Sequence, residues 1–303
     1  MKTVVVLSGK GGTGKTSVTA SLAMFEARNG TPLVIADADV DASNLPLLLH
    51  PTNVTTRPFI GGELAAVDAD RCKGHGACVE SCRFDAIHQN GERARAYVDP
   101  TACEGCAVCT LVCPEKALSM VPREAGTWSV GESRFGPIAF AELNSGGENS
   151  GKLVTQVRQA AVSLAHDRNA ALVLVDGPPG TGCAVIAAMT GADLVVAVTE
   201  PTPSARSDLE RLLKLAHHFR CPVGVVFNKA DLNPAFAETT AGDLSAQGVA
   251  LLGSVPYNES VARCIGRGLC PAECNGPVAA ALEQVHRQVT ELLRGLTTDA
   301  ASA

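Results

Sequence analysis

Aromatic residues and basic charge are both scarce in this chain of 303 residues. Aromatic side chains make up 4% of the sequence, so we expect a core built from alanine, valine and leucine. Lysine and arginine total 25 against 31 for aspartate and glutamate, and the net charge of -6 argues against a nucleic-acid-binding surface. No apolar run approaches the roughly 18 residues of a membrane-spanning helix, and the stretch Met1–Ser8 is too short for an export signal. We therefore expect a cytoplasmic protein that binds no nucleic acid and has no stable membrane anchor.

Short apolar segments rich in β-branched residues recur along the chain, and helix-length segments separate most of them. Buried strands that alternate with helices are typical of a parallel sheet with helices on both faces. The sequence therefore predicts the α/β class, with a mainly parallel β-sheet flanked by helices. Leu282–Leu296 is expected to pack on this sheet as a helix, since its few basic residues do not suit a membrane surface. The expected strands are Thr3–Ser8, Pro32–Ala36, Ala171–Val175, Leu194–Thr199, Val223–Phe227 and Ala250–Ser254.

The alternation breaks between about His50 and Lys152, where glycine, proline and cysteine dominate. Seven of the twelve cysteines lie between Cys72 and Cys113. Because neither an export signal nor a small size calls for disulfides, this clustering favours metal or cluster ligation. We expect one discontinuous domain of residues 1–55 and 126–303, with a small α+β domain of residues 56–125 inserted into it.

A phosphate-binding loop follows the first expected strand. Gly9–Thr16 fits G-x-x-x-x-G-K-[ST] and lies between a strand and a helical segment, as this motif requires. The glycines let backbone N–H groups surround phosphate oxygens, while Lys15 reaches the β- and γ-phosphates and the Thr16 hydroxyl ligates Mg²⁺. The residues expected to bind the phosphates are Gly11, Gly12, Thr13, Gly14, Lys15, Thr16 and Ser17.

A second lysine, Lys10, lies within this loop. Gly-Lys-Gly-Gly-Thr-Gly-Lys-Thr resembles the deviant Walker A motif of the superfamily that contains MinD, ParA, Mrp and the nitrogenase iron protein. In that superfamily the extra lysine contacts phosphates bound by the other protomer of a nucleotide-sandwich dimer. The resemblance implies a P-loop fold, a Mg-dependent ATPase in which Lys10 and Lys15 are catalytic, and an ATP-dependent homodimer or a heterodimer with a similar ATPase.

Two acidic segments complete the expected nucleotide site. Asp37-Ala38-Asp39-Val40-Asp41 stands where the superfamily has its first switch, and an aspartate there can orient the attacking water. Asp39 is the first candidate and Asp41 the second, whereas Asp37 is interpreted as a capping or metal-shell residue. Asp176 ends a Walker B-like apolar run and is expected to hold Mg²⁺, and Gly177–Gly182 resembles the second switch of Mrp-type members.

The segment Asn228-Lys229-Ala230-Asp231 has, taken alone, the guanine-reading form N-K-x-D. In the superfamily indicated by Lys10 the equivalent asparagine contacts adenine, and a segment like Val255–Asn258, which contains Pro256, also contacts the base. The longer Walker A match favours ATP over GTP.

Cys103, Cys106, Cys109 and Cys113 match the bacterial ferredoxin spacing C-x₂-C-x₂-C-x₃-C-P. Three cysteines of such a run ligate one [4Fe–4S] cluster, and the fourth ligates a second cluster. Zinc, the main alternative, seldom takes four ligands this close together in sequence.

A partial copy of this run precedes it, with His75 at the second ligand position. Crossed ligation assigns one cluster to Cys103, Cys106, Cys109 and Cys82. The other cluster takes Cys72, Cys78 and Cys113, with His75 as a candidate fourth ligand. That second cluster is interpreted as [4Fe–4S] with histidine or an open iron, or as [3Fe–4S], and His75 as an exposed turn residue is the alternative.

Five cysteines lie outside this module. Cys183 and Cys221 are expected to be small buried apolar residues. For Cys264, Cys270 and Cys274 the spacing leaves open whether they bind a metal.

The chain as a whole resembles MinD-superfamily ATPases that carry an inserted ferredoxin domain, a subgroup that Gly147–Val154 also typifies. The resemblance implies ATP, Mg²⁺ and two iron–sulfur clusters as cofactors, and a redox or iron–sulfur protein as partner. The leading hypothesis is that nucleotide-driven rearrangement of a dimer controls electron transfer through the clusters. An ATP-dependent iron–sulfur carrier or scaffold of the Mrp type is the alternative, and a positioning ATPase like MinD or ParA is the third.

Overall fold

The computed structural model describes residues 1–144 and 149–301, which form two compact units. The first unit contains Met1–Thr56, Trp128–Glu142 and Gly151–Ala303. The second contains Arg57–Thr127 and Leu143–Ser150. Two long strands, β3 and β6, each begin in one unit and end in the other.

A nine-stranded sheet organises the first unit, in the order β11-β10-β9-β1-β8-β2-β7-β6-β3. Every pairing from β11 across to β7 is parallel. The expected α/β class with a mainly parallel sheet is therefore confirmed. The strands are β1 (Lys2–Ser8), β2 (Leu33–Asp37), β3 (Thr52–Val67), β6 (Leu118–Ser133), β7 (Gly136–Leu143), β8 (Leu172–Pro179), β9 (Leu194–Thr199), β10 (Val223–Asn228) and β11 (Ala250–Val255).

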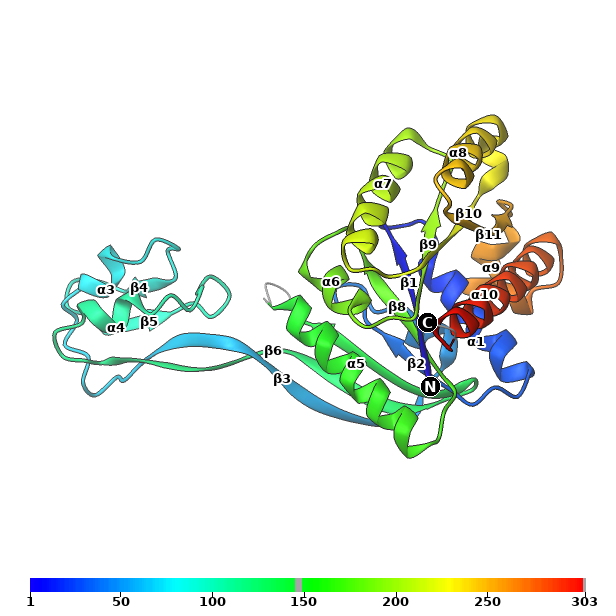
Figure 1. Ribbon diagram of the computed structural model, residues 1–303. Coiled ribbons are helices and arrows are strands. Elements are labelled where there is room, and N and C mark those ends of the chain that lie inside the picture. The colour runs from blue at the N-terminus through cyan, green and yellow to red at the C-terminus, as the bar shows by residue number, and fades with distance from the viewer. Residues whose placement is uncertain (145–148, 302–303) are drawn as a thin grey trace. The chain divides into compact units, whose positions relative to one another are not determined.

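Helices cover both faces of this sheet because its strands are apolar on both sides. Along β1, Val4 and Val6 belong to the core shared with α1 and α10, whereas Val5 and Leu7 point to the opposite face. Figure 1 shows α1 and α10 on one side of the strands and α5, α6 and α7 on the other. The helices of this unit are α1 (Lys15–Arg28), α2 (Leu45–Leu49), α5 (Ser150–Asp167), α6 (Cys183–Met189), α7 (Pro203–His218), α8 (Pro234–Ala246), α9 (Ser260–Ile265) and α10 (Pro277–Ala301), with short 3₁₀ turns η1 (Ala230–Leu232) and η2 (Pro271–Glu273).

The last helix, α10, packs its apolar stripe on the sheet as the sequence predicts. Leu282, Val285 and Val289 are buried in the main core, and Leu292, Leu293 and Leu296 pack against it. Within the described residues, no helix combines the length and the apolar character needed to cross a membrane.

Three strands of the sheet, β3, β6 and β7, were not expected from the sequence. β7 extends the parallel sheet directly, with Ile138 in register with Ile35 of β2. Most of β3 is exposed, so its side chains lack the apolar alternation that reveals a half-buried strand. The chain that leads to and from the cysteine-rich region is thus partly regular structure.

The second unit is small and is built around cysteines. β4 (Ile87–Gln89) pairs antiparallel with β5 (Ala96–Val98), next to the short helices α3 (Ala77–Glu80) and α4 (Val108–Val112). Its buried core combines three cysteines with small and branched apolar residues: Ala65, Cys78, Ala86, Ile87, Ala96, Cys103, Cys109 and Leu118.

The sequence repeat in this unit is also a repeat of backbone geometry. The N–H of Asp68 donates to the carbonyl of Ala117 (2.8 Å), and the N–H of Asp99 donates to that of Ala86 (2.7 Å). Left-handed backbone recurs at three pairs of equivalent positions, which are Gly74 and Gly105, Gly76 and Ala107, and Asp85 and Lys116. His75 therefore occupies the place in the first copy that Cys106 occupies in the second.

Candidate functional site

The phosphate-binding loop connects β1 to α1 and depends on glycine at two positions. Gly12 and Gly14 both adopt positive φ, and Gly14 is the N-cap of α1. A Cβ on Gly14 would also collide with the side-chain amide of Asn228. The first turn of α1 thus presents its free N–H groups at the loop, which favours an anion there.

Two buried carboxylates lie below the loop, at the carboxyl ends of adjacent strands. Asp37 of β2 and Asp176 of β8 are in register, and both are fully buried. The pKa of Asp37 lies well above its usual value, mainly because the carboxyl is buried and secondly because the charge of Asp176 is near. Burial raises the pKa of Asp176, whereas Thr16, Lys15 and Thr19 offset part of that rise, and the resulting pKa is about 6.

Asp37 and Asp176 have different local partners. Asp37 accepts hydrogen bonds from the N–H groups of Asp39 (3.1 Å) and Leu45 (3.0 Å) and from the Ser43 hydroxyl (2.9 Å). It thereby orders the segment that leads into α2. In contrast, Oδ2 of Asp176 is buried and has no hydrogen-bond partner among the residues described. Such an oxygen, near the Thr16 hydroxyl, suits a hard cation such as Mg²⁺.

Lys15 points into this acidic centre. Its Nζ lies 3.5 Å from Oδ2 of Asp39, and only 5% of its side chain is exposed. Burial raises the pKa of Asp39 and Lys15 offsets part of that rise, so the pKa lies above its usual value. Asp41 is exposed on the same segment. The structure therefore brings Lys15, Asp39 and Asp176 together and leaves Asp41 at the surface.

A cavity of about 250 Å³ lies beside the loop, and Gly12, Gly14, Ser17, Asn228 and Pro256 all line it. Asn228 donates its side-chain N–H to the Thr13 carbonyl at 2.7 Å, so the end of β10 supports the loop. The position and residues of this cavity suit a nucleobase.

Asp231, the last residue of the N-K-x-D segment, is already engaged. Its Oδ1 accepts the backbone N–H of Tyr257 at 2.5 Å, which fixes the segment that carries Pro256. This carboxylate oxygen of Asp231 therefore stabilises the wall of the cavity and is not available to a ligand.

Lys10, the second loop lysine, does not point toward Lys15 and its partners. Its Nζ lies 2.6 Å from Oε1 of Glu200, the residue that follows β9. Lys229 approaches the other oxygen of Glu200 at 3.2 Å and also donates to the Gly12 carbonyl at 3.2 Å. Glu200 thus joins a lysine of the loop to a lysine that follows β10.

A disulfide lies beside one wall of the cavity that suits a nucleobase. Ile265 and Pro271 line the cavity, and a disulfide joins Cys264 in α9 to Cys274 just after η2. The open question about these cysteines is resolved in part: two of them form a disulfide, and Cys270 is a fully buried free thiol. Burial and, to a smaller extent, Glu273 together raise the pKa of Cys270 to about 12, so this thiol is unreactive.

The cysteines of the second unit line two separate cavities. One is lined by Cys82, Cys103, Cys106 and Cys109, among others. The other is lined by Cys72, His75, Cys78 and Cys113, among others. Each cavity is thus lined by the first three motif positions of one sequence copy and by the last cysteine of the other copy.

Backbone N–H groups donate to cysteine sulfurs at equivalent places in both copies. The N–H of Ala86 lies 3.4 Å from Sγ of Cys82, and that of Ala117 lies 3.3 Å from Sγ of Cys113. Burial raises the pKa of Cys78 and of Cys109, so in the free protein these thiols are protonated at neutral pH. Hydrogen bonds to sulfur are the outer contacts that iron–sulfur clusters use.

No three histidine, cysteine, aspartate or glutamate side chains in the described part of the chain are grouped so as to hold one metal ion. A tetrahedral zinc site needs such a convergent group. An iron–sulfur cluster instead takes one cysteine per iron around its outside.

His75 is accessible at the edge of its cavity. Its side chain is 48% exposed, and Nε2 lies 3.9 Å from a carboxylate oxygen of Glu115. Cys106, at the equivalent position, is also exposed.

One expectation about the remaining cysteines is wrong. Cys183 is exposed, because it begins α6 directly after the Gly177–Gly182 loop instead of lying inside an element. Cys221 is half-buried and close to the Met189 carbonyl. Within the motif Gly147–Val154, Gly147 and Glu148 lie outside the described residues, and Ser150 is the first residue of α5.

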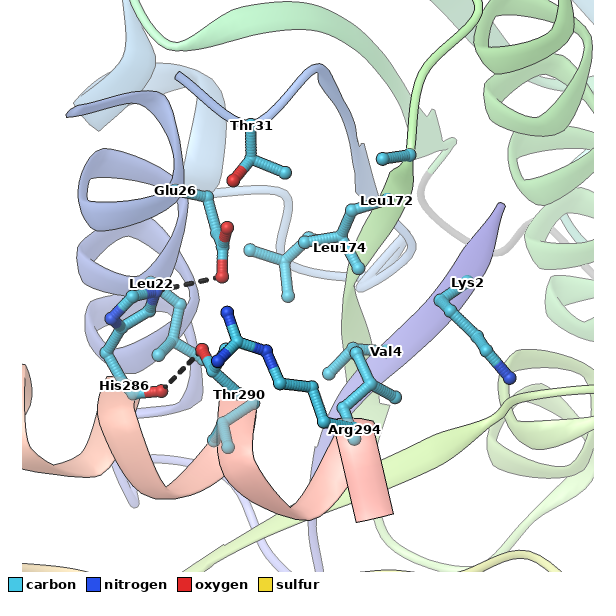
Figure 2. A pocket seen from close by; sticks show the side chains of 13 residues that line it. Lys2, Val4, Leu22, Glu26, Thr31, Leu172, Leu174, His286, Thr290 and Arg294 are labelled. Atoms are coloured by element: carbon cyan, nitrogen blue, oxygen red, sulfur yellow. Dashed lines mark hydrogen bonds and ion pairs between the residues drawn. The ribbon is translucent and has the colours of Figure 1, made fainter. Parts of the chain in front are cut away.

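A second cavity, of about 270 Å³, lies at the opposite end of β1 from the loop. Its walls are apolar side chains of β1, α1, β8 and α10, such as Val4, Leu22 and Leu174. Figure 2 shows Glu26, His286 and Arg294 turned toward one another at its polar side, where His286 Nε2 lies 2.8 Å from Glu26 Oε1. No residue expected at the nucleotide site lines this cavity.

Three residues of the nucleotide site escaped the sequence analysis: Thr19, Ser43 and Glu200. The Thr19 hydroxyl donates to Oδ1 of Asp176 at 3.0 Å, one helical turn after Lys15. That spacing places Thr19 on the same helix face as Lys15, which is the signal available for it. Glu200 carried no local motif at all.

Comparison with known proteins identifies the family. The family model described as the CobQ/CobB/MinD/ParA nucleotide binding domain matches residues 4–272. An uncharacterized protein of Methanocaldococcus jannaschii is 29% identical over 290 residues, which cover 96% of this chain and 97% of the relative. The chloroplastic septum site-determining protein MinD homologue of Arabidopsis thaliana is 26% identical and covers 90% of this chain and 69% of its own length.

Solved structures show the same fold at lower identity. The cell division ATPase MinD of Pyrococcus furiosus aligns with a TM-score of 0.57 at 19% identity, covering 96% of this chain and 99% of the other. MinD of Pyrococcus horikoshii, solved with Mg-ADP, aligns with a TM-score of 0.58 at 16% identity, covering 96% of each chain. The loop, the paired aspartates and the family match lead to one conclusion: the chain belongs to the CobQ/CobB/MinD/ParA family of nucleotide-binding domains.

Proposed function

We propose that this protein is a Mg-dependent ATPase whose second unit carries two iron–sulfur clusters, and that nucleotide-driven dimer rearrangement controls electron transfer through them. The observation that carries this proposal is the division of the seven clustered cysteines between two cavities. The nucleotide-binding domain that the family match identifies would supply the ATP-binding part of this function.

The ATPase chemistry rests on Lys15, Asp39 and Asp176. A γ-phosphate that takes the Lys15 ammonium releases Asp39 from its ion pair, and Asp39 can then orient the attacking water. Thr16 and the unpartnered oxygen of Asp176 are the residues that would hold Mg²⁺, which neutralises charge on the β- and γ-phosphates. Engagement of Asp231 with Tyr257 supports adenine rather than guanine, because guanine reading needs that carboxylate free.

The redox part rests on the second unit. Cys82, Cys103, Cys106 and Cys109 would hold one cluster, and the cavity of Cys113 and His75 the other. When bound, the clusters supply one-electron redox chemistry. An imidazole in place of a thiolate removes negative charge, so His75 as a ligand would raise the potential of its cluster and give electron flow a direction.

The test combines composition with nucleotide dependence. Protein purified anaerobically should contain iron and sulfide for two clusters, and its EPR spectrum or reduction rates should differ between Mg-ATP and Mg-ADP. Identical spectra and rates in both states would contradict the coupling, and a lack of sulfide would contradict the clusters. ATP hydrolysis is measured separately, so that each half of the proposal stands or fails alone.

A second candidate, an iron–sulfur carrier or scaffold, draws support from the exposure of His75. A cluster with an accessible, weakly held iron is suited to transfer. Incubation with an apo-ferredoxin separates the two functions: cluster transfer favours the carrier, and retention through many turnovers favours the redox ATPase.

A positioning ATPase is the third candidate, because several relatives are named as MinD. The apolar stripe of α10 is packed on the core through Leu282, Val285 and Val289, which leaves those residues unavailable to a membrane. Vesicle binding stimulated by ATP would favour this function over the other two.

A further inference from the structure

Glu200 holds two lysines: Lys10 within the phosphate-binding loop and Lys229 beside it. One carboxylate oxygen contacts Lys10 at 2.6 Å, and the other contacts Lys229 at 3.2 Å. The Glu200 side chain is 16% exposed, so these ion pairs are partly shielded from water. A single carboxylate thus offsets one of the two positive charges that these lysines carry.

The position of Glu200 is fixed by its neighbours. It follows β9 directly, and its carbonyl accepts the N–H of Thr202, the N-cap of α7. Burial raises the pKa of Glu200, but the hydrogen bonds from Lys10 and Lys229 outweigh that effect, and the pKa lies below its usual value. The carboxylate is therefore ionised at neutral pH and is ordered at the loop.

Phosphate and carboxylate oxygens compete for the same ammonium groups. Lys10 also contacts the Ser204 hydroxyl at 3.4 Å, and Lys229 also holds the Gly12 carbonyl. For Lys10 to contact a phosphate, its ammonium must leave Glu200. The stronger this ion pair, the more nucleotide is needed to break it.

We infer that Glu200 is a positioning residue that competes with nucleotide phosphate for Lys10, and that it sets the ATP concentration at which the chain becomes active. This inference rests on the proposed ATPase function. The phosphate in question belongs either to the nucleotide in the same chain or to the nucleotide of a second copy. In both cases, removing the Glu200 charge frees Lys10.

The test uses Glu200→Gln, which keeps the size and hydrogen-bonding capacity of the side chain but removes its charge. Titration of the full, anaerobically purified chain with a fluorescent ATP analogue should give a Kd about threefold to fivefold lower than for the unmodified protein. The gain should shrink as salt is added, because exposed charges are screened. It should also shrink in the Lys10→Ala background, where the main competing contact no longer exists.

Two arms distinguish the source of the phosphate. Binding measured at dilution, where the chain is monomeric, reports on the chain's own nucleotide. Sedimentation at increasing ATP reports on dimer formation, and a lower ATP midpoint with an unchanged monomer Kd would assign Lys10 to the nucleotide of the second copy. Glu210→Gln, on the exposed face of α7, is the matched control and should change neither quantity.

Each outcome has a defined meaning. Unchanged or weaker binding and dimerisation in Glu200→Gln would overturn the inference, since Glu200 would then only support the loop. Glu200→Ala provides a second neutral variant in case glutamine alters folding, which circular dichroism checks. If the unmodified protein binds no ATP at all, the proposed function fails, and that result is distinct from a failure of the competition.

Discussion

Different chemistry stabilises the core of each of the two units of this protein. In the first unit, fully buried valine, leucine and isoleucine side chains on parallel strands form the core, and the polar groups gather where the strands end. In the second unit, cysteines take a large share of a small core, alongside residues such as Ala86 and Ile87. A unit of that size buries little apolar surface, so it needs a further source of stability.

The difference shows where each unit is vulnerable. The first unit tolerates rearrangement of the charges at its loop because its strands are stabilised independently of them. Under the proposed function, the second unit depends for its stability on the clusters that its cysteines would hold. Perturbations should therefore act on one unit at a time, in the order of expected effect given below.

The largest effect is expected for Cys109→Ser, which removes a buried thiol from the core of the second unit. We expect loss of the iron that the proposed cluster in that cavity would contain, and rapid proteolysis within Arg57–Thr127, since metal binding and folding are coupled in such modules. ATP binding by the first unit should persist. Cys183→Ser, at an exposed cysteine of the first unit, is the control. Simultaneous loss of ATP binding would show that the units are not independent.

Lys15→Ala should reverse this pattern. Loss of a buried ammonium that contacts Asp39 should weaken ATP binding on the order of 100-fold, while iron and sulfide contents stay unchanged. Equilibrium titration measures the first and chemical analysis the second. Lys214→Ala, at an exposed lysine of α7, should leave both at their original values. An iron content that falls together with ATP affinity would argue against two separately stabilised units.

The Cys264–Cys274 disulfide tests whether sulfur stabilises the first unit as well. Replacing both cysteines by serine should lower the free energy of unfolding by about 2–3 kcal/mol. A smaller loss of ATP affinity should accompany this, because Ile265 and Pro271 in the same wall line the base cavity. Chemical denaturation and ATP titration measure the two effects. Equal unfolding transitions in both proteins would mean that the disulfide adds nothing to this unit.

The smallest effect is expected at the second cavity of the first unit. Burial raises the pKa of Glu26, but hydrogen bonds from His286 and Thr31 outweigh it, and the net pKa lies below 4.5. Glu26 therefore stabilises the fold above its ordinary pKa, and this contribution is lost as the pH falls through its lowered value. Glu26→Gln should cost about 1 kcal/mol at pH 7 and less near pH 3.

Denaturant titrations at these two pH values, with Glu283→Gln as an exposed control on α10, measure this difference. A cost that is the same at both pH values would show that the Glu26 charge plays no part in stability.

The sequence was informative wherever a function depends on neighbours in the chain. The Gly9–Thr16 loop, the strand that contains Asp176 and the apolar stripe of α10 are all local patterns, and the structure forms the expected feature at each of them. Ligand assignments in the second unit remain predictions from spacing. The cavity linings support them through the placement of Cys82 and Cys113.

The features that were missed depend on contacts between distant segments. Glu200 meets Lys10 across 190 positions of sequence, and no local pattern distinguishes it from other acidic residues after a strand. The pairing of Cys264 with Cys274 could not be chosen over one with Cys270 from spacing alone. β3 is long but mostly exposed, so hydrophobic periodicity could not reveal it.

The exchange of the last cysteine between the two sequence copies has a consequence for how this module can change. Cys113 comes from the second copy but lines the cavity of the first, and Cys82 does the reverse. Neither copy alone supplies all the cysteines that line one cavity, so a fragment with one copy would lack one of the sulfurs at its cavity. The two copies therefore depend on each other, because each cavity is lined by a cysteine that the other copy provides.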